Sequence, residues 1–271
     1  MLTPVRLLIE ETFATATYTL PITSGWVSPA DGITVEMAHH LTSDSALEES
    51  ILIAPAPEIL RLQQTHQVAV DVAVIADGNG AIALRTPVRP DEVEATPVRL
   101  LETSGVAELL ARATLKPFYG IEPTSWVRDG DSTEAARAEV VIVEGAEALR
   151  EPEAGFSEDL SQAWFILTGQ PVVSHVLLAP SALPPADLTN VLTFLDTGRT
   201  DGLARRRDWR PQLADREGVG RDRASAFWAA QRLKMELADR QALLELLAKG
   251  SRGTSDPPPA SVRFSDGAGS E

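Results

Sequence analysis

Short apolar runs that alternate with helical patterns constrain the fold of this chain more than any other feature. The apolar residues of 105–115 and 185–197 fall at i, i+3, i+4 and i+7, which predicts two amphipathic helices. Strand-like runs lie between the helical segments, at residues 5–9, 33–37, 49–54, 68–75, 81–84, 97–101, 139–143 and 171–178. This alternation is typical of an α/β protein, in which helices connect the strands of a sheet.

Turn and break signals divide this pattern further. Asn79-Gly80 separates two strand-like runs and suits a type I′ turn, so the sequence predicts a hairpin there. Residues 222–249 carry a long helical pattern, which we expect to break near Asp239, where the aspartate caps a second helix. Residues 250–271 are rich in Gly, Ser, Pro and Asp and include three consecutive prolines. We predict that this last segment is a disordered tail.

Charge and composition exclude several classes of function. The 271 residues include 24 Lys and Arg against 39 Asp and Glu, a net charge of −15, which argues against nucleic acid as a partner. Without cysteine there is no disulfide, thiolate nucleophile or iron–sulfur cluster, and no glycine-rich phosphate loop is present. The four histidines lack the spacing of metal ligands. We expect no metal and no cofactor.

The sequence also bears on the membrane and on location. No apolar run approaches the ~20 residues that span a bilayer, so we expect no membrane partner. The first nine residues lack a charged region, a long apolar core and a small-residue cleavage site. These features predict a cytoplasmic protein, and no pattern in the sequence specifies its oligomeric state.

Thr103-Ser104-Gly105 stands between a strand-like run and an amphipathic helix. Hydroxyls at the start of a helix commonly cap its backbone N–H groups. The alternative is that the free N–H groups, the helix dipole and the hydroxyls together bind a substrate carboxylate. In open α/β sheets, ligands bind at the carboxyl ends of strands, which is where this turn is predicted to lie. Thr103, Ser104 and Gly105 are therefore candidate ligand-binding residues.

The order of several short motifs resembles the chorismate dehydratases of the futalosine route to menaquinone. Residues 140–149 are similar to the family's Ile-Gly-Asp-x-Ala-Leu strand end, and they are followed by Phe156, Asp159-Leu160, Trp164 and Thr168-Gly169-Gln170-Pro171. Residues 51–59, 74–78 and 98–104 resemble further family segments. The resemblance implies a two-lobed α/β fold of the type II periplasmic-binding-protein kind, with a mixed sheet in each lobe.

Within that fold we place two lobes and a hinge. The first lobe is predicted to take residues 1–86 and 180–249, and the second residues 87–179. Two strands that cross between the lobes, near residues 84–89 and 173–178, are expected to form the hinge around a cleft. Glu144 and His175 are expected to lie near this cleft.

The departures from the family pattern fall at polar positions. Ala14 stands where family members have an asparagine that reaches into the cleft, and Val106-Ala107 replace a Thr-Ser pair. Thr15 offers a replacement hydroxyl beside Ala14. The resemblance thus names Ala14 and Thr15, with Thr103, Ser104 and Gly105, as substrate-binding positions, and it assigns no catalytic residue.

Two functions follow from this resemblance. The first is a hydro-lyase that eliminates water from chorismate to give 3-[(1-carboxyvinyl)oxy]benzoate, a reaction that needs neither metal nor nucleotide. The second is a diverged solute-binding-like protein that binds a small carboxylate in the cleft without turnover. Loss of the asparagine and of the Thr-Ser pair favours the second, and whether the chain is an enzyme stays open at this point.

Overall fold

The computed structural model describes residues 4–39, 41, 47–128, 133 and 135–265, and in this part of the chain the strands form two mixed sheets. The first sheet has the order β11-β4-β10-β3-β1-β2, with β12 added beside β4. β1 lies parallel to β2 and β3, whereas β10 is antiparallel to β3 and β4. Its strands are β1 (Val5–Glu10), β2 (Ile33–Ala38), β3 (Ile51–Pro55), β4 (His66–Ala76), β10 (Val172–Pro180), β11 (Gln231–Arg232) and β12 (Phe264–Ser265).

The second sheet is built from the middle of the chain and has the order β7-β6-β8-β5-β9. β6 is parallel to β7 and β8, and β5 is antiparallel to β8 and β9. The two mixed sheets with flanking helices confirm the predicted two-lobed α/β class. The strands are β5 (Ile82–Thr86), β6 (Ala95–Leu100), β7 (Glu122–Arg128), β8 (Val140–Glu144) and β9 (Phe156–Asp159).

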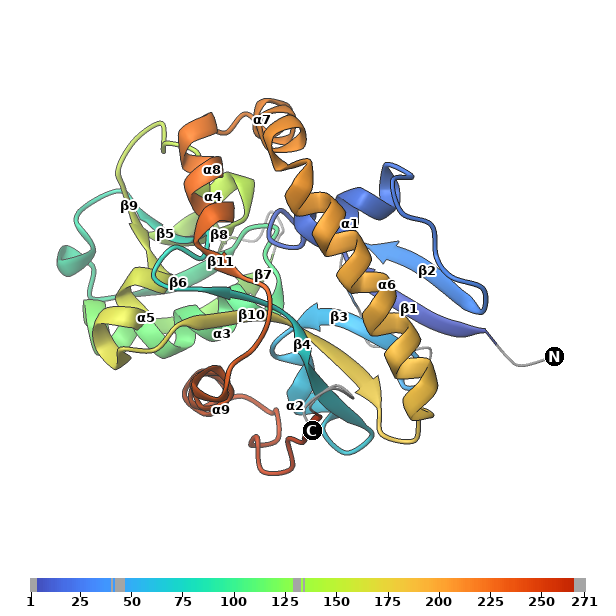
Figure 1. Ribbon diagram of the computed structural model, residues 1–271. Helices are drawn as coiled ribbons and strands as arrows, with labels where there is room; N and C mark the ends of the chain where they lie inside the picture. Colours follow the sequence, from blue (N-terminus) through green and yellow to red (C-terminus); the bar gives the residue numbers. More distant parts are fainter. Residues whose placement is uncertain (1–3, 40, 42–46, 129–132, 134, 266–271) are drawn as a thin grey trace.

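The helices cover the faces of these sheets, and α6 runs along one face of the first sheet (Figure 1). They are α1 (Ala16–Thr23), α2 (Glu58–Leu62), α3 (Gly105–Thr114), α4 (Ala146–Leu149), α5 (Leu160–Thr168), α6 (Pro185–Ala204), α7 (Arg206–Arg216), α8 (Arg221–Ala230) and α9 (Leu237–Gly250). Shorter turns are η2 (Pro90–Glu92), η3 (Leu115–Tyr119) and η4 (Ala135–Arg137). In α9, Asp239 caps from the third helical position, where its carboxylate accepts the N–H of Glu236 at 2.7 Å.

The chain changes sheet one strand earlier than the predicted lobe boundaries at both crossings. β5 belongs to the second sheet although residues 82–86 were assigned to the first lobe, and β10 belongs to the first sheet although most of it was assigned to the second lobe. The crossings are residues 77–81 and 169–171. A strand-like sequence predicts an extended conformation but not the strand with which it pairs. The sheet that β5 and β10 each join could therefore not be predicted from the sequence pattern.

The hairpin predicted at Asn79-Gly80 is wrong. β4 and β5 lie in different sheets, and the segment between them connects the lobes. A type I′ turn needs positive φ at both central residues, but here Gly78 and Ala81 have positive φ, at 74° and 49°. Gly80 instead permits close packing, because a Cβ there would lie 2.1 Å from the Ser161 hydroxyl oxygen.

The segment from Ser251 to Ser265, predicted to be disordered, packs against the first lobe. Phe264 and Ser265 form β12, which pairs with Val68 and Ala69 of β4. The Gln63 side chain accepts the N–H of Ser261 at 3.0 Å and donates to the carbonyl of Pro258 at 3.1 Å. These long-range bonds hold a sequence that has little apolar content of its own, and residues 266–271 of the predicted tail lie outside the described residues.

One of the two buried hydrophobic clusters spans both lobes. A single cluster contains Leu52 and Ile75 of the first sheet together with Val98 and Ile142 of the second. Helix α9 lies between them, where Gly250 packs directly on Leu109 of α3. The lobes are therefore joined by buried apolar contacts in addition to the two crossing segments.

Candidate functional site

A cleft of about 530 Å³ opens between the lobes, at the carboxyl ends of β1, β6 and β8. Strand ends are the usual place for ligands in open α/β sheets, because loops and helix starts converge there. Four glutamates, one arginine and one histidine give the wall its charge, and Phe13 supplies an apolar surface. The polar residues of the wall include Glu11, Thr12, His39, Glu102, Ser104, Glu144, Arg216 and Glu217.

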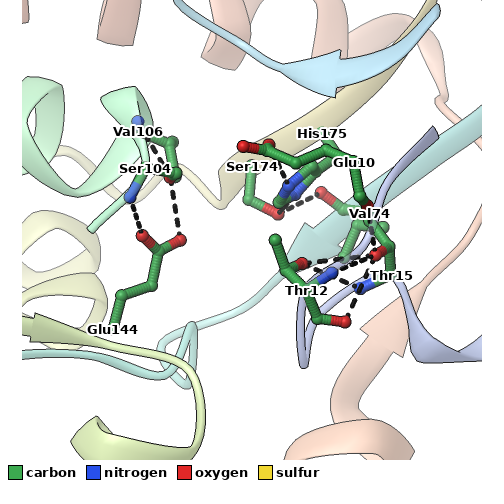
Figure 2. Close-up of polar contacts among 9 residues, drawn as sticks. All are labelled: Glu10, Thr12, Thr15, Val74, Ser104, Val106, Glu144, Ser174 and His175. Atoms are coloured by element: carbon green, nitrogen blue, oxygen red, sulfur yellow. Dashed lines mark hydrogen bonds and ion pairs between the residues drawn. The ribbon is translucent and has the colours of Figure 1, made fainter. Parts of the chain in front are cut away.

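Ser104 and Glu144 form the best-defined polar contact of the wall (Figure 2). Ser104 is the N-cap of α3, and its Oγ accepts the N–H of Val106 at 3.2 Å. The Glu144 carboxylate accepts the Ser104 N–H at 2.6 Å and the Ser104 Oγ–H at 3.0 Å. A carboxylate from the end of β8 therefore occupies the N-terminus of a ten-residue helix, where the helix dipole favours negative charge.

Burial raises the pKa of Glu144 above its ordinary value. The two hydrogen bonds from Ser104 and the proximity of His175 act in the opposite direction, while Glu10 acts with burial. Burial dominates because a charged carboxylate loses its hydration when it leaves water. The carboxyl group of Glu144 consequently holds a proton at higher pH than a free glutamate does.

Glu10 and His175 form a second polar cluster inside the lobe interface (Figure 2). Both side chains are buried, and His175 Nε2 lies 3.4 Å from Glu10 Oε2. The Ser174 hydroxyl donates to the carbonyl of Val74 at 3.1 Å, so its oxygen is left to accept from His175 Nδ1, also at 3.1 Å. The Nε2 side of the His175 ring therefore faces the Glu10 carboxyl group inside the protein.

Backbone strain marks the wall at Glu102. Its φ is 46°, in the left-handed region that a residue with a side chain rarely adopts. Glu102 lies two residues after the end of β6, and the strained step turns the chain into the start of α3. Such strain commonly collects at functional sites, since the surrounding structure must hold it in place.

The comparison with protein families decides the assignment. A family model described as menaquinone biosynthesis matches residues 40–252, most of the chain. The chain belongs to this family. The resemblance found in the sequence motifs is thereby confirmed, and family membership implies a role in menaquinone biosynthesis. A search of curated proteins finds no match.

Solved structures similar to this member of the menaquinone-biosynthesis family share its fold at low sequence identity. Protein AF1704 from Archaeoglobus fulgidus superposes with a TM-score of 0.66 at 13% identity, over 92% of this chain and 97% of that one. The alkanesulfonate-binding protein SsuA from Xanthomonas axonopodis pv. citri, bound to MOPS, gives 0.62 at 12% identity, over 97% and 99%. The Candida albicans CA3427 product, described as having the generic periplasmic binding protein fold, gives 0.60 at 9%, over 98% and 97%. These likenesses confirm the predicted fold.

The structure places the predicted site residues of this family member in different surroundings. Only Ser104 of the five is on the cleft wall. Thr103 is buried, and its carbonyl accepts a hydrogen bond from Arg128 at 3.4 Å. Gly105 begins α3 and lies close to Pro57, whose Cγ would be 3.3 Å from an added Cβ.

Ala14 and Thr15 serve the turn between β1 and α1. Thr15 is fully buried, and its Oγ1 donates to the carbonyl of Glu10 at 2.7 Å and accepts the N–H of Thr12 at 2.9 Å. Ala14 is buried too, and its carbonyl accepts from the Gln231 side chain at 3.2 Å. Both positions lie before residue 40, where the family match begins.

Several wall residues were not singled out from the sequence. Glu11 follows β1 directly and Glu102 lies two residues after β6, and their positions at strand ends are the signal that could have identified them. Arg216 and Glu217 come from the end of α7, and no sequence signal marks them as cleft residues, because only the tertiary fold brings α7 to the cleft. Arg216 Nε donates to Glu217 at 3.0 Å, so the one arginine of the wall is already paired with a carboxylate.

Within the described ranges no three His, Asp or Glu side chains gather in a way that would hold a metal ion. None of the helices in the same ranges combines the length and the apolar composition that a membrane span needs.

Proposed function

We propose that the chain is a lyase of the chorismate dehydratase type, which eliminates water from chorismate to give 3-[(1-carboxyvinyl)oxy]benzoate. The interlobe cleft is its active site. The observation that carries this proposal is the Ser104–Glu144 pair at the cleft wall, which combines a helix N-terminus with a carboxyl group of raised pKa. The proposal agrees with the role in menaquinone biosynthesis that family membership implies.

The elimination breaks one C–H bond and one C–O bond of the ring, and the electron pair of the C–H bond completes the aromatic system. A base accepts the ring proton, and a proton donor converts the leaving hydroxyl into water. Glu144 suits the role of donor, because burial raises the pKa of its carboxyl group and so favours the protonated form. A second carboxylate of the wall, such as Glu11 or Glu102, suits the role of base. Carbon oxidation states balance without an external oxidant.

Binding without turnover is the second candidate function. The observation that favours it is that Glu144 already occupies the α3 N-terminus, while Ala14 places no polar side chain in the cleft. The wall then lacks both the amide and the open helix start that would hold a dicarboxylate in a reactive position. Such a protein would bind a small carboxylate and release it unchanged.

Incubation of the purified protein with chorismate, followed by chromatography of the products, distinguishes the two functions. The dehydratase predicts formation of 3-[(1-carboxyvinyl)oxy]benzoate, and Glu144→Gln should lower the rate by about 10²-fold or more, as loss of a general acid does. Ser104→Ala serves as a second variant and should also lower it. If no product forms but chorismate raises the melting temperature, the protein binds without turnover. If neither occurs, both functions are wrong.

A further inference from the structure

Glu144 occupies the same hydrogen-bond donors that a carboxylate ligand would need. The Ser104 N–H and the Ser104 Oγ–H both point at its carboxylate, at 2.6 and 3.0 Å (Figure 2). These groups lie at the start of α3, on the wall of the cleft. At the place where the sequence predicts an anion site, a side chain 40 residues away thus occupies the donors.

Two hydrogen bonds from the neutral donors of Ser104 hold the Glu144 carboxylate. Of the other groups that act on it, His175 lowers the pKa of Glu144 and Glu10 raises it. No Lys or Arg is among these groups. A carboxylate that is buried without a cationic partner is held less firmly than one in an ion pair. A ligand carboxylate that replaces Glu144 would therefore accept the same two hydrogen bonds from Ser104.

We infer that Glu144 is an internal competitor for the carboxylate ligand of the cleft, displaced by the ligand from the start of α3 with uptake of one proton. The ligand carboxylate accepts the two Ser104 hydrogen bonds, and the displaced Glu144 becomes a neutral carboxylic acid. One anion and one proton enter together, so the charge of the cleft does not change. The inference rests on the proposed function in taking a small carboxylate as the ligand.

The proximity of two carboxylates is the reason why proton uptake accompanies binding. A ligand carboxylate at Ser104 would lie beside an ionised Glu144, and the one arginine of the wall is paired with Glu217. Like charges at short distance raise the pKa of a carboxyl group, so Glu144 is the group that protonates. The titratable groups that face it or share its cleft are Glu10, Glu11, His39, Glu102, His175, Arg216 and Glu217.

Equilibrium binding of benzoate and of chorismate between pH 6 and pH 8.5, measured by calorimetry, tests this inference. For the wild type we expect affinity to fall about tenfold per pH unit in the upper part of this range, the slope for uptake of one proton. Calorimetry in buffers of different ionisation enthalpy should count that proton directly. Glu144→Gln should bind benzoate about tenfold more tightly at pH 8, with the pH slope removed.

Three matched variants separate the role of Glu144 from general effects of charge and folding. Glu11→Gln removes one charge from the same wall and leaves the Ser104 contact filled, so it should keep the slope. His39→Gln tests the only histidine among the residues that line the cleft, and it should also keep the slope. Glu144→Ala removes the carboxyl group from the Ser104 donors, so it should also bind benzoate more tightly than the wild type. If this variant does not fold, the isosteric Glu144→Gln alone tests the inference.

The outcomes keep this inference apart from the proposed function. Benzoate affinity that is independent of pH in the wild type, or unchanged in Glu144→Gln, overturns the inference even if chorismate is converted. A slope that disappears in His39→Gln overturns it as well. Conversely, proton-coupled benzoate binding that depends on Glu144 supports it even if no product forms from chorismate, in which case the dehydratase alone fails.

Discussion

Asp159 is a capping residue whose surroundings oppose its charge. Its carboxylate accepts the N–H groups of Ser161 and Gln162, at 2.7 and 3.2 Å, at the start of α5. Burial nevertheless raises the pKa of Asp159 from 3.8 to about 6, because desolvation outweighs the two hydrogen bonds. The cap therefore stabilises the fold most when it is protonated or replaced by a neutral acceptor.

Asp159→Asn should alter the pH dependence of stability. A folded-state pKa above the unfolded one means that the native state binds more protons, so this contribution to stability is complete below about pH 4 and is lost as pH rises through about 6. Asparagine can still accept the capping bonds but does not titrate. We expect the free energy of unfolding of the variant, relative to wild type, to rise by roughly 1–2 kcal/mol between pH 4 and pH 7.5.

Urea unfolding at the two pH values measures this difference. Glu158→Gln, at the exposed neighbouring position, is the control for removal of one negative charge from the same region. A difference between Asp159→Asn and wild type that is equal at both pH values would contradict the argument.

Ser104 shows how far a single residue could be predicted. Its place between strand and helix indicated a cap, and it is the N-cap of α3. The identity of the anion at this cap was beyond the sequence, because nothing local links Ser104 to Glu144 across 40 residues. The contact forms only because β6 and β8 are parallel neighbours that end at the same edge of the second sheet.

At the scale of the element, α6 contains two glycines with opposite roles. A Cβ at Gly202 would lie 2.8 Å from the carbonyl oxygen of Thr17 and 3.0 Å from Pro21 Cγ, where α6 crosses α1. At Gly198, one turn earlier, no heavy atom lies within 4 Å of the same position. The predicted helix ended at Gly198, whereas α6 continues to Ala204, because packing on α1 outweighs the weak helix propensity of glycine.

Alanine at these two positions should change stability in opposite directions. Gly202→Ala forces α6 away from α1 and is expected to lower the free energy of unfolding by about 1–3 kcal/mol. Gly198→Ala restricts the unfolded chain and adds helix propensity without a clash, so it should raise stability by about 0.5–1 kcal/mol. Chemical denaturation gives the free energy of unfolding of each variant. Equal changes in the two variants would refute the argument that Gly202 is needed where α6 crosses α1.

At the scale of the whole molecule, the shared core couples the lobes. Residues of both sheets belong to one buried cluster, and α9 packs on α3 of the second lobe as well as on β10 of the first. Buried apolar contact of this kind couples the unfolding of the parts it joins. β5 and β10 each stay within one sheet, so the strands near 84–89 and 173–178 do not cross between the lobes as expected. A hinge at the crossings, residues 77–81 and 169–171, would have to act against these contacts.

We therefore expect thermal unfolding in one cooperative transition. Differential scanning calorimetry should give a single peak with equal calorimetric and van't Hoff enthalpies. Tryptophan fluorescence should report the same midpoint, since Trp126 lies in β7 of the second sheet and Trp209 of α7 belongs to a buried cluster with residues of the first. Two resolved peaks would show that the lobes unfold independently.

The sequence by itself determined the α/β class, the capped start of α3 and the family, because periodicity, capping residues and motif order are local properties. Tertiary structure decided which sheet each strand joined, since β5 and β10 carry no local mark of their partners. It also ordered the segment from Ser251 to Ser265 through contacts with Gln63 and β4. The contact of Glu144 with the start of α3 is likewise a long-range contact, which local sequence does not encode.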